Sequence, residues 1–170
     1  MDEYVFNDIK TVVAYLLNKL DNPTPLKLQK GLYFLWAFYS ASYGSIPYDS
    51  DDHGEFEETD RYPKYLFPAD FEAWKYGPVI KDVYHNFKEG KYQDIKNEFV
   101  PTTSNQKEVV LFMDDIIKQV NDVNDFGLVE RSHQDSAWKD KFEKGKRNVL
   151  MDPEEIRKDY VGYFNEQSQI

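Results

Sequence analysis

One stretch in the first quarter of the chain limits the possible folds more than any other. Thr24 and Pro25 suit the N-cap and the first position of a helix, and the sequence LKLQKGLYFLWAFYSASYG continues that helix to a stop at Gly44. Residues 32–39 are apolar on almost all sides of it. A helix of this kind is usually covered by neighbouring elements on several sides. We therefore expect a central, aromatic-rich helix with the rest of the chain packed around it.

The first turns of this helix differ from the remainder. Lys27, Gln29 and Lys30 are polar, whereas the positions after Gly31 are almost all apolar. We therefore expect this end of the helix to reach the surface. The two lysines are then candidate contacts for a partner.

Further segments have the apolar spacing and the end signals of helices. They are residues 6–20, 105–121 and 125–132, and a last helix that follows a capping box at Asp152–Glu155. Residues 92–99 predict only a weak helical turn or two, and residues 45–48 and 65–67 could at most pair briefly as strands. The expected fold is all-α: a single compact domain over residues 1–170, with six to eight helices around the central one and at most a short β-hairpin.

The sequence FEAWKYGPVIKDVYHNF is rich in aromatic side chains and contains the pair Gly77-Pro78. Gly permits backbone angles that other residues avoid, and Pro fits the first turn of a helix. We therefore predict a turn at Tyr76-Gly77, supported by Trp74, and a helix from Pro78 to about Lys88. The stretch predicts a structural corner around which helices pack. It lacks the nucleophile and base of a catalytic site.

Composition excludes several classes of protein. The chain has no cysteine, so disulfides and thiolate metal sites are excluded, and such a chain suits a reducing cytoplasm. No apolar run approaches the ~18–20 residues of a membrane span, and the acidic N-terminus lacks the basic start of a signal peptide. The formal net charge of −10 disfavours direct nucleic-acid binding, which needs clustered Lys and Arg, and would suit a basic protein partner.

Two polar stretches are expected to be solvated. Residues 49–65 contain seven carboxylates between Asp49 and Asp60, without the spacing of a calcium-binding loop. We interpret them as a solvated loop or a surface for a basic partner rather than a calcium site. The sequence KDKFEKGKR, residues 139–147, alternates basic with acidic side chains, which is typical of an exposed face.

The usual catalytic motifs are missing from the sequence. It contains no GxSxG elbow, P-loop, GxGxxG or HExxH pattern. Ser132, His133 and Asp135 are the residue types of a catalytic triad, but neighbours in sequence seldom reach triad geometry. We interpret His133, close to Trp138, as an anchor that holds a short helix to the core. We expect no catalytic residue, cofactor or metal site, and no enzyme activity.

Three segments together point to a known family. In the order PLKLQKGLYFLWAFY, FEAWKYGPVIKDVYHNF and SHQDSAW, they resemble the Panacea (SocA-like, DUF4065) domain, which is known also from phage-associated proteins. The resemblance extends from about Val12 to Phe164, and AWKYGPV is its most specific part. Residues 49–65 depart from the pattern and look like an acidic insertion.

The resemblance implies an α-helical antitoxin domain that neutralises a partner toxin by direct protein contact, with the toxin encoded by a neighbouring gene and no direct binding of nucleic acid or membrane. An adaptor that delivers a partner to a protease or regulatory complex is the alternative. A third hypothesis is a small-molecule or enzymatic role around Trp74, Tyr76 and His133. The residues that match the family signature or are candidate partner contacts are Lys27, Gln29, Lys30, Tyr33, Trp74, Tyr76, Gly77, Pro78, Tyr84, His133 and Trp138.

Overall fold

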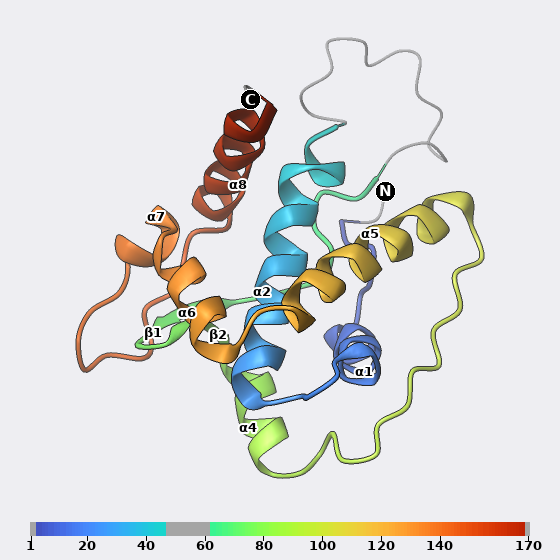
Figure 1. Ribbon diagram of the computed structural model, residues 1–170, viewed down its shortest axis with the longest axis horizontal. Coiled ribbons are helices and arrows are strands. Elements are labelled where there is room, and N and C mark those ends of the chain that lie inside the picture. The colour runs from blue at the N-terminus through green and yellow to red at the C-terminus, as the bar shows by residue number, and fades with distance from the viewer. Residues whose placement is uncertain (1–2, 47–61, 169–170) are drawn as a thin grey trace.

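The computed structural model describes residues 3–46 and 62–168, and it is mostly helical (Figure 1). In these residues seven α-helices accompany a single two-stranded antiparallel hairpin, which confirms the predicted fold class. The elements are α1 (Ile9–Lys19), α2 (Pro25–Ala41), the short 3-10 helix η1 (Tyr43–Ser45), β1 (Phe71–Trp74), β2 (Gly77–Ile80), α4 (Lys81–Lys88), α5 (Ser104–Asn121), α6 (Asp125–His133), α7 (Ser136–Lys139) and α8 (Pro153–Ser168). Most of the expected acidic insertion at 49–65 lies outside the described residues.

Helix α2 is the central element, as its all-round apolar surface predicts. It contacts α1, α4, α5, α6, α8 and β2, and Figure 1 shows it running through the middle of the molecule. Leu28, Leu32 and Leu35 are fully buried on it, and the indole of Trp36 donates a hydrogen bond of 3.0 Å to the carbonyl oxygen of Phe67. Thr24 caps the helix and Pro25 opens it.

The predicted stop of this helix at Gly44 is wrong. The α-helix ends at Ala41, and Gly44 lies within the 3-10 helix that follows. The glycine is needed for space, because a Cβ built on it would lie 2.1 Å from the carbonyl oxygen of Lys64. No real Cβ contact is that short, so the neighbouring backbone segment passes where a side chain would stand.

The other helices follow their sequence signals closely. Asp8 caps α1, Thr103 and Gln106 form a full capping box at α5, and Asn124 caps α6. At α8 the carboxylate of Asp152 accepts the N–H of Glu154 at 2.9 Å, whereas the predicted capping box requires that of Glu155. The weak helical turns predicted at 92–99 are reduced to a turn that ends at Asp94.

The stretch from 71 to 87 differs most from the prediction. Residues 78–80 belong to β2 instead of a helix, and α4 begins only at Lys81. β1 and β2 pair in the register Trp74↔Gly77 to Phe71↔Ile80, so Lys75 and Tyr76 form a two-residue turn. The predicted turn is present but lies one residue earlier, at Lys75-Tyr76 instead of Tyr76-Gly77. The helix start is wrong because strand pairing overrides the local preference of Pro78.

A brief pairing of 45–48 with 65–67 was considered; residues 47–48 lie outside the described residues, and the described residues of the two segments do not pair with each other. Tyr65 forms a single parallel bridge with Tyr4, and the N–H of Phe6 donates to the carbonyl oxygen of Leu66. The hairpin itself receives a third segment instead. The N–H of Ala73 donates to Val149 at 2.9 Å, and the N–H of Met151 donates to Phe71 at 2.8 Å.

Candidate functional site

The open edge of β2 is closed by side chains of α2. The amide of Gln29 forms two hydrogen bonds with the backbone of Ile80, accepting its N–H at 2.8 Å and donating to its carbonyl oxygen at 3.2 Å. Next to it, the ammonium of Lys30 donates to the carbonyl oxygen of Pro78 at 2.9 Å. Pro78 has no backbone N–H, so at this residue the edge of β2 has no unpaired donor. The two side chains take the place of a neighbouring strand.

This arrangement corrects the expectation that the start of α2 reaches the surface. Lys27, Gln29 and Lys30 are 8%, 3% and 0% exposed, respectively. A polar side chain can be buried when it is hydrogen-bonded, and the carbonyls of β2 supply the acceptors for two of the three. In the folded protein, Lys27, Gln29 and Lys30 are therefore not surface contacts for a partner.

Burial also changes the charge state of Lys30. The low-polarity surroundings disfavour the ammonium form and lower the pKa of Lys30 to about 7. At neutral pH this lysine therefore exchanges between the charged and neutral forms. It has a buried acceptor in the carbonyl oxygen of Pro78 but no carboxylate partner among the described residues.

Gly77 lies directly against Lys30 and Ser132. Its φ is +104°, and a Cβ built on it would lie 2.4 Å from Oγ of Ser132 and 2.7 Å from Cε of Lys30. Both the backbone angle and the lack of space require glycine at this position. The hairpin is thereby packed closely onto α2 and α6.

Helices α6 and α7 hold the turn of the hairpin from the other side. Nε2 of His133 lies 3.0 Å from the carbonyl oxygen of Lys75, and the indole of Trp138 donates to the carbonyl oxygen of Trp74 at 2.8 Å. The His133 ring is stacked on Trp138 with centroids 4.0 Å apart. Partial burial lowers the pKa of His133, so it favours the neutral ring. His133 thus contacts both α7 and the hairpin turn, while its role as an anchor stays a prediction.

The residue types of a triad do not form one. Ser132 donates to the carbonyl oxygen of Val129, and His133 faces the backbone of Lys75. The carboxylate of Asp135 points elsewhere. Its Oδ2 accepts the hydroxyls of Tyr33 at 2.6 Å and Tyr160 at 2.7 Å.

Asp135 is the centre of a polar cluster that joins α2, α6 and α8. Besides the two tyrosines, its Oδ1 accepts the guanidinium of Arg131 at 3.1 Å, and that guanidinium lies over the rings of Tyr160 and Tyr163. Burial raises the pKa of Asp135 against the opposing effect of these donors. Sequence reasoning placed Tyr33 in the family signature but missed the roles of Arg131, Asp135 and Tyr160. The only signal was Asp135 inside SHQDSAW.

The outward side of the hairpin has a different character. Tyr76 at the turn is 48% exposed, and Tyr84 on α4 is half-buried with its ring edge-to-face against Trp74. The guanidinium of Arg147 lies 4.6 Å from the ring centre of Trp74. Most of the predicted site residues thus lie at one hairpin, some beneath it and some on its outer surface, whereas no described contact joins Lys27 to it.

The residues of this hairpin lie within the part of the chain that matches a known protein family. The model of the family described as "Antitoxin SocA-like, Panacea domain" matches residues 54–139, half of the chain. The chain belongs to this family. The Panacea match contains two of the three signature segments, FEAWKYGPVIKDVYHNF and SHQDSAW, whereas PLKLQKGLYFLWAFY lies before it. It also begins inside the stretch expected to be an insertion.

Other comparisons add no relatives of this Panacea chain. No curated protein and no solved structure matches it. Among the described residues, no helix has the length and apolar character needed to cross a membrane, and no group of three His, Asp or Glu side chains is arranged to hold a metal ion.

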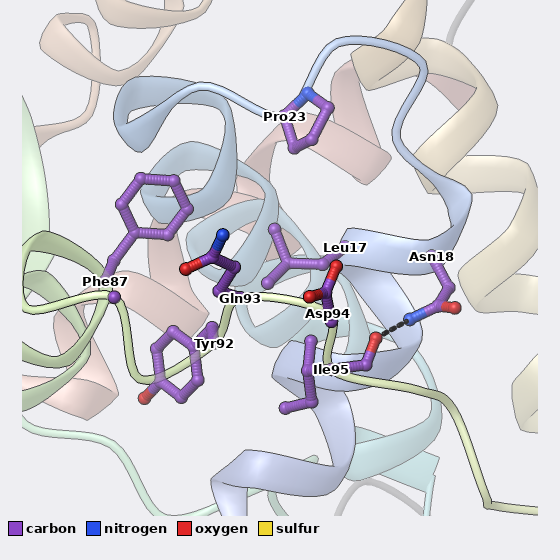
Figure 2. A pocket seen from close by; sticks show the side chains of 9 residues that line it. Leu17, Asn18, Pro23, Phe87, Tyr92, Gln93, Asp94 and Ile95 are labelled. Atoms are coloured by element: carbon purple, nitrogen blue, oxygen red, sulfur yellow. Dashed lines mark hydrogen bonds between the residues drawn. The ribbon is translucent and has the colours of Figure 1, made fainter.

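Two pockets lined by described residues of this Panacea chain lie apart from the hairpin turn. One of about 410 Å³ is bordered by α1 and the segment after α4, where the side chain of Asn18 donates to the carbonyl oxygen of Ile95 at 3.0 Å (Figure 2). A second, of about 370 Å³, touches Gln29 and Tyr84. Neither is lined by Trp74, Tyr76 or His133, the residues around which a small-molecule site was considered.

Proposed function

We propose that this chain is an antitoxin-like protein that neutralises a partner toxin by direct protein–protein contact, the toxin being the product of a neighbouring gene. Membership of the Panacea family supports an antitoxin role in general. The observation that carries the proposal to this chain is the exposed Tyr76 at the tip of a rigidly held hairpin. Tyrosine is frequent among the residues that dominate binding energy, and a preorganised position reduces the entropy lost on binding.

Burial reduces the number of side chains that are candidates for contact with a partner. Because the side chains beneath the hairpin are buried, they support it and do not meet a partner. Tyr76 and the half-buried Tyr84 remain available. Trp138 is 8% exposed and His133 is stacked on it, so both belong to the supporting layer.

A binding role fits this site better than catalysis. Ser132, His133 and Asp135 each have a separate structural partner in the described residues, so none activates another. The buried Lys30 with its lowered pKa is covered by the hairpin, and Gly77 leaves no room above it for a substrate. The proposal therefore assigns these residues to the support of a binding surface in the cytoplasm.

Co-expression with the product of the adjacent gene tests the proposal. The neighbour alone should arrest growth, growth should recover when this chain is co-expressed, and the two proteins should co-purify. The comparison variant is Gly77→Val, which we expect to destabilise the fold and to weaken both rescue and co-purification. A neighbour that is harmless alone and does not co-purify would remove the main support for an antitoxin role.

A further inference from the structure

A surface on the outer side of the hairpin combines four exposed side chains with the half-buried Tyr84 and with Trp74, which is only 8% exposed. We call it the outer hairpin face, and it comprises Trp74, Lys75, Tyr76, Tyr84, Arg147 and Leu150. Resting on the proposed function, we propose that this face is where the partner docks, and that the partner presents an acidic, extended segment to it.

The aromatic part of the face is built around one indole. Trp74 lies between the ring of Tyr84, whose centroid is 5.0 Å away, and the guanidinium of Arg147. Its own indole N–H donates to Glu72 at 3.1 Å, so the ring is fixed in place. Trp, Tyr and Arg are the residue types most enriched among interface hot spots. Here all three are held in contact before any partner binds.

The face carries two cations, Lys75 and Arg147, and one carboxylate, Glu72, which accepts the indole N–H of Trp74. Lys75 and Arg147 are both exposed, and no carboxylate of the described residues forms an ion pair with either. Arg147 also ends the stretch 139–147, which carries five basic and two acidic side chains. An acidic partner segment would therefore meet unpaired cations, which favours its association and its orientation.

The acidic net charge of the chain does not oppose this inference. Of the formal charge of −10, residues 49–60 alone contribute seven carboxylates and no Lys or Arg, so the rest of the chain carries only −3. The sign of the whole chain favours a basic partner, but the sign of this face is the opposite. Because charges more than about 8 Å apart are largely screened at physiological salt, the local charge decides what binds.

The backbone beside the face offers a place for an extended segment. Residues 149–151 pair with β1 through the carbonyl of Val149 and the N–H of Met151. In an extended chain, the N–H and C=O of Leu150 then point to the opposite side. Within the described residues they have no hydrogen-bond partner, and the Leu150 side chain is 57% exposed. A free edge of this kind is what an added strand pairs with.

The aromatic rings, the cations and the free backbone edge together indicate how the partner's segment binds. It runs as a short strand along Leu150 and places an apolar side chain against Leu150 and Tyr76. Its carboxylates then reach Lys75 and Arg147. Single-stranded nucleic acid also favours aromatic and basic surfaces, and the experiment below distinguishes the two.

The test uses the full-length chain and the product of the adjacent gene that co-purifies with it. Lys75→Glu/Arg147→Glu should raise the Kd about tenfold or more, because each reversed charge would face a carboxylate. Lys107→Glu/Lys118→Glu changes the net charge equally on α5, which lies on the other side of α2 in Figure 1, and should change the Kd less than about twofold. Because Arg147 also covers Trp74, Lys75→Glu alone is a second variant with less effect on folding.

The strand pairing has its own variant. Leu150→Pro removes the outward N–H but spares both hydrogen bonds to β1, whereas Leu150→Ala removes only the side chain. We expect the proline variant to bind several-fold more weakly than the alanine variant. Equal affinities of these two variants would refute an extended segment on this edge.

Other outcomes separate this inference from the antitoxin role. If the unaltered chain binds the neighbour and the Lys75→Glu/Arg147→Glu variant binds it equally well, the face is wrong and the antitoxin role stands. Equal losses in the α5 control would likewise refute the face. If the unaltered chain does not bind the neighbour, both proposals fail. If a fluorescent oligothymidine binds the chain and loses binding in the Lys75→Glu/Arg147→Glu variant, the occupant is nucleic acid and the inference is overturned.

Discussion

The ammonium nitrogen of Lys30 on α2 lies 2.9 Å from the carbonyl oxygen of Pro78 on β2, in a fully buried position. This hydrogen bond and the two from Gln29 attach the hairpin to the central helix. The hairpin in turn carries the exposed residues proposed to bind a partner. The buried Lys30 thus helps to position the exposed side of the hairpin, although its own side chain is not part of that surface.

Replacing Gly77 tests how closely the hairpin is packed. Gly77→Val should lower the free energy of unfolding by about 2–5 kcal/mol, since it combines a strained positive φ with a clash against Ser132 and Lys30. Gly145 is the matched control. Its φ is also positive, at +83°, but nothing lies within 4 Å of a Cβ built there.

Urea unfolding of Gly77→Val, Gly145→Val and the unaltered chain measures the difference. The control should lose only the backbone contribution, about 1–2 kcal/mol. Equal losses in the two variants would show that strain alone, without the close contact, determines the need for glycine at position 77.

The buried lysine should make stability depend on pH. Its pKa is about 7 in the folded chain and near the ordinary value of 10.5 after unfolding. Between these values the unfolded chain binds a proton that the folded chain lacks, so stability rises with pH by up to about 1.4 kcal/mol per unit. Below about pH 7 both states are protonated and Lys30 adds no further slope.

The comparison for this prediction is Lys30→Met. Urea unfolding between about pH 7 and pH 9.5, below the range in which exposed tyrosines ionise, should show a smaller rise for the variant than for the unaltered chain. Parallel curves would mean that Lys30 remains charged in the folded protein across this range.

The sequence predicts the helices well because their signals are local. Thr24 with Pro25 and the pair Thr103 and Gln106 mark helix starts within four residues of the groups that they cap. The hairpin was missed for the opposite reason. Strand β2 is stabilised by Gln29 and Lys30, about fifty residues earlier, which no local pattern around Gly77-Pro78 can reveal.

The difference between local and long-range contacts also explains for which site residues the exposure was predicted correctly. Tyr76 was a candidate partner contact because tyrosine is a frequent hot-spot residue, and its side chain is exposed. Lys30 was predicted to be exposed because it is charged, and its burial depends on an acceptor that only the tertiary structure provides. Asp135 contacts Tyr33, 102 residues away, and this pairing has no signature in the sequence.

The polar cluster around Asp135 should be important for stability. Asp135→Asn keeps an oxygen for Tyr33 and Tyr160 but leaves the half-buried Arg131 without its carboxylate. We expect a loss of about 2–4 kcal/mol in the free energy of unfolding. Asp140→Asn, at an exposed position nearby without an ion pair in the described part of the chain, should cost no more than about 0.5 kcal/mol. Similar values for the two variants in thermal or urea unfolding would contradict a structural role for the cluster.

Tyr76 should matter for binding and hardly at all for folding. Its side chain is 48% exposed, and its described interaction is with the ammonium of Lys75, 5.4 Å from the ring centre. Tyr76→Ala should therefore change the free energy of unfolding by no more than about 0.5 kcal/mol. As a hot-spot residue at a rigid turn, it should weaken the complex with the neighbouring gene product by about 1.4 kcal/mol or more, a tenfold rise in Kd.

The control for this prediction is Leu111→Ala, which removes a side chain that is 70% exposed on α5. It should leave both stability and affinity unchanged within error, because it lies outside the hairpin. Calorimetric titration and urea unfolding of the same preparations compare the two quantities directly. If Tyr76→Ala lowers stability as much as affinity, the tyrosine supports the turn. If instead Leu111→Ala weakens binding more, the partner docks on α5 and the hairpin is a structural corner only.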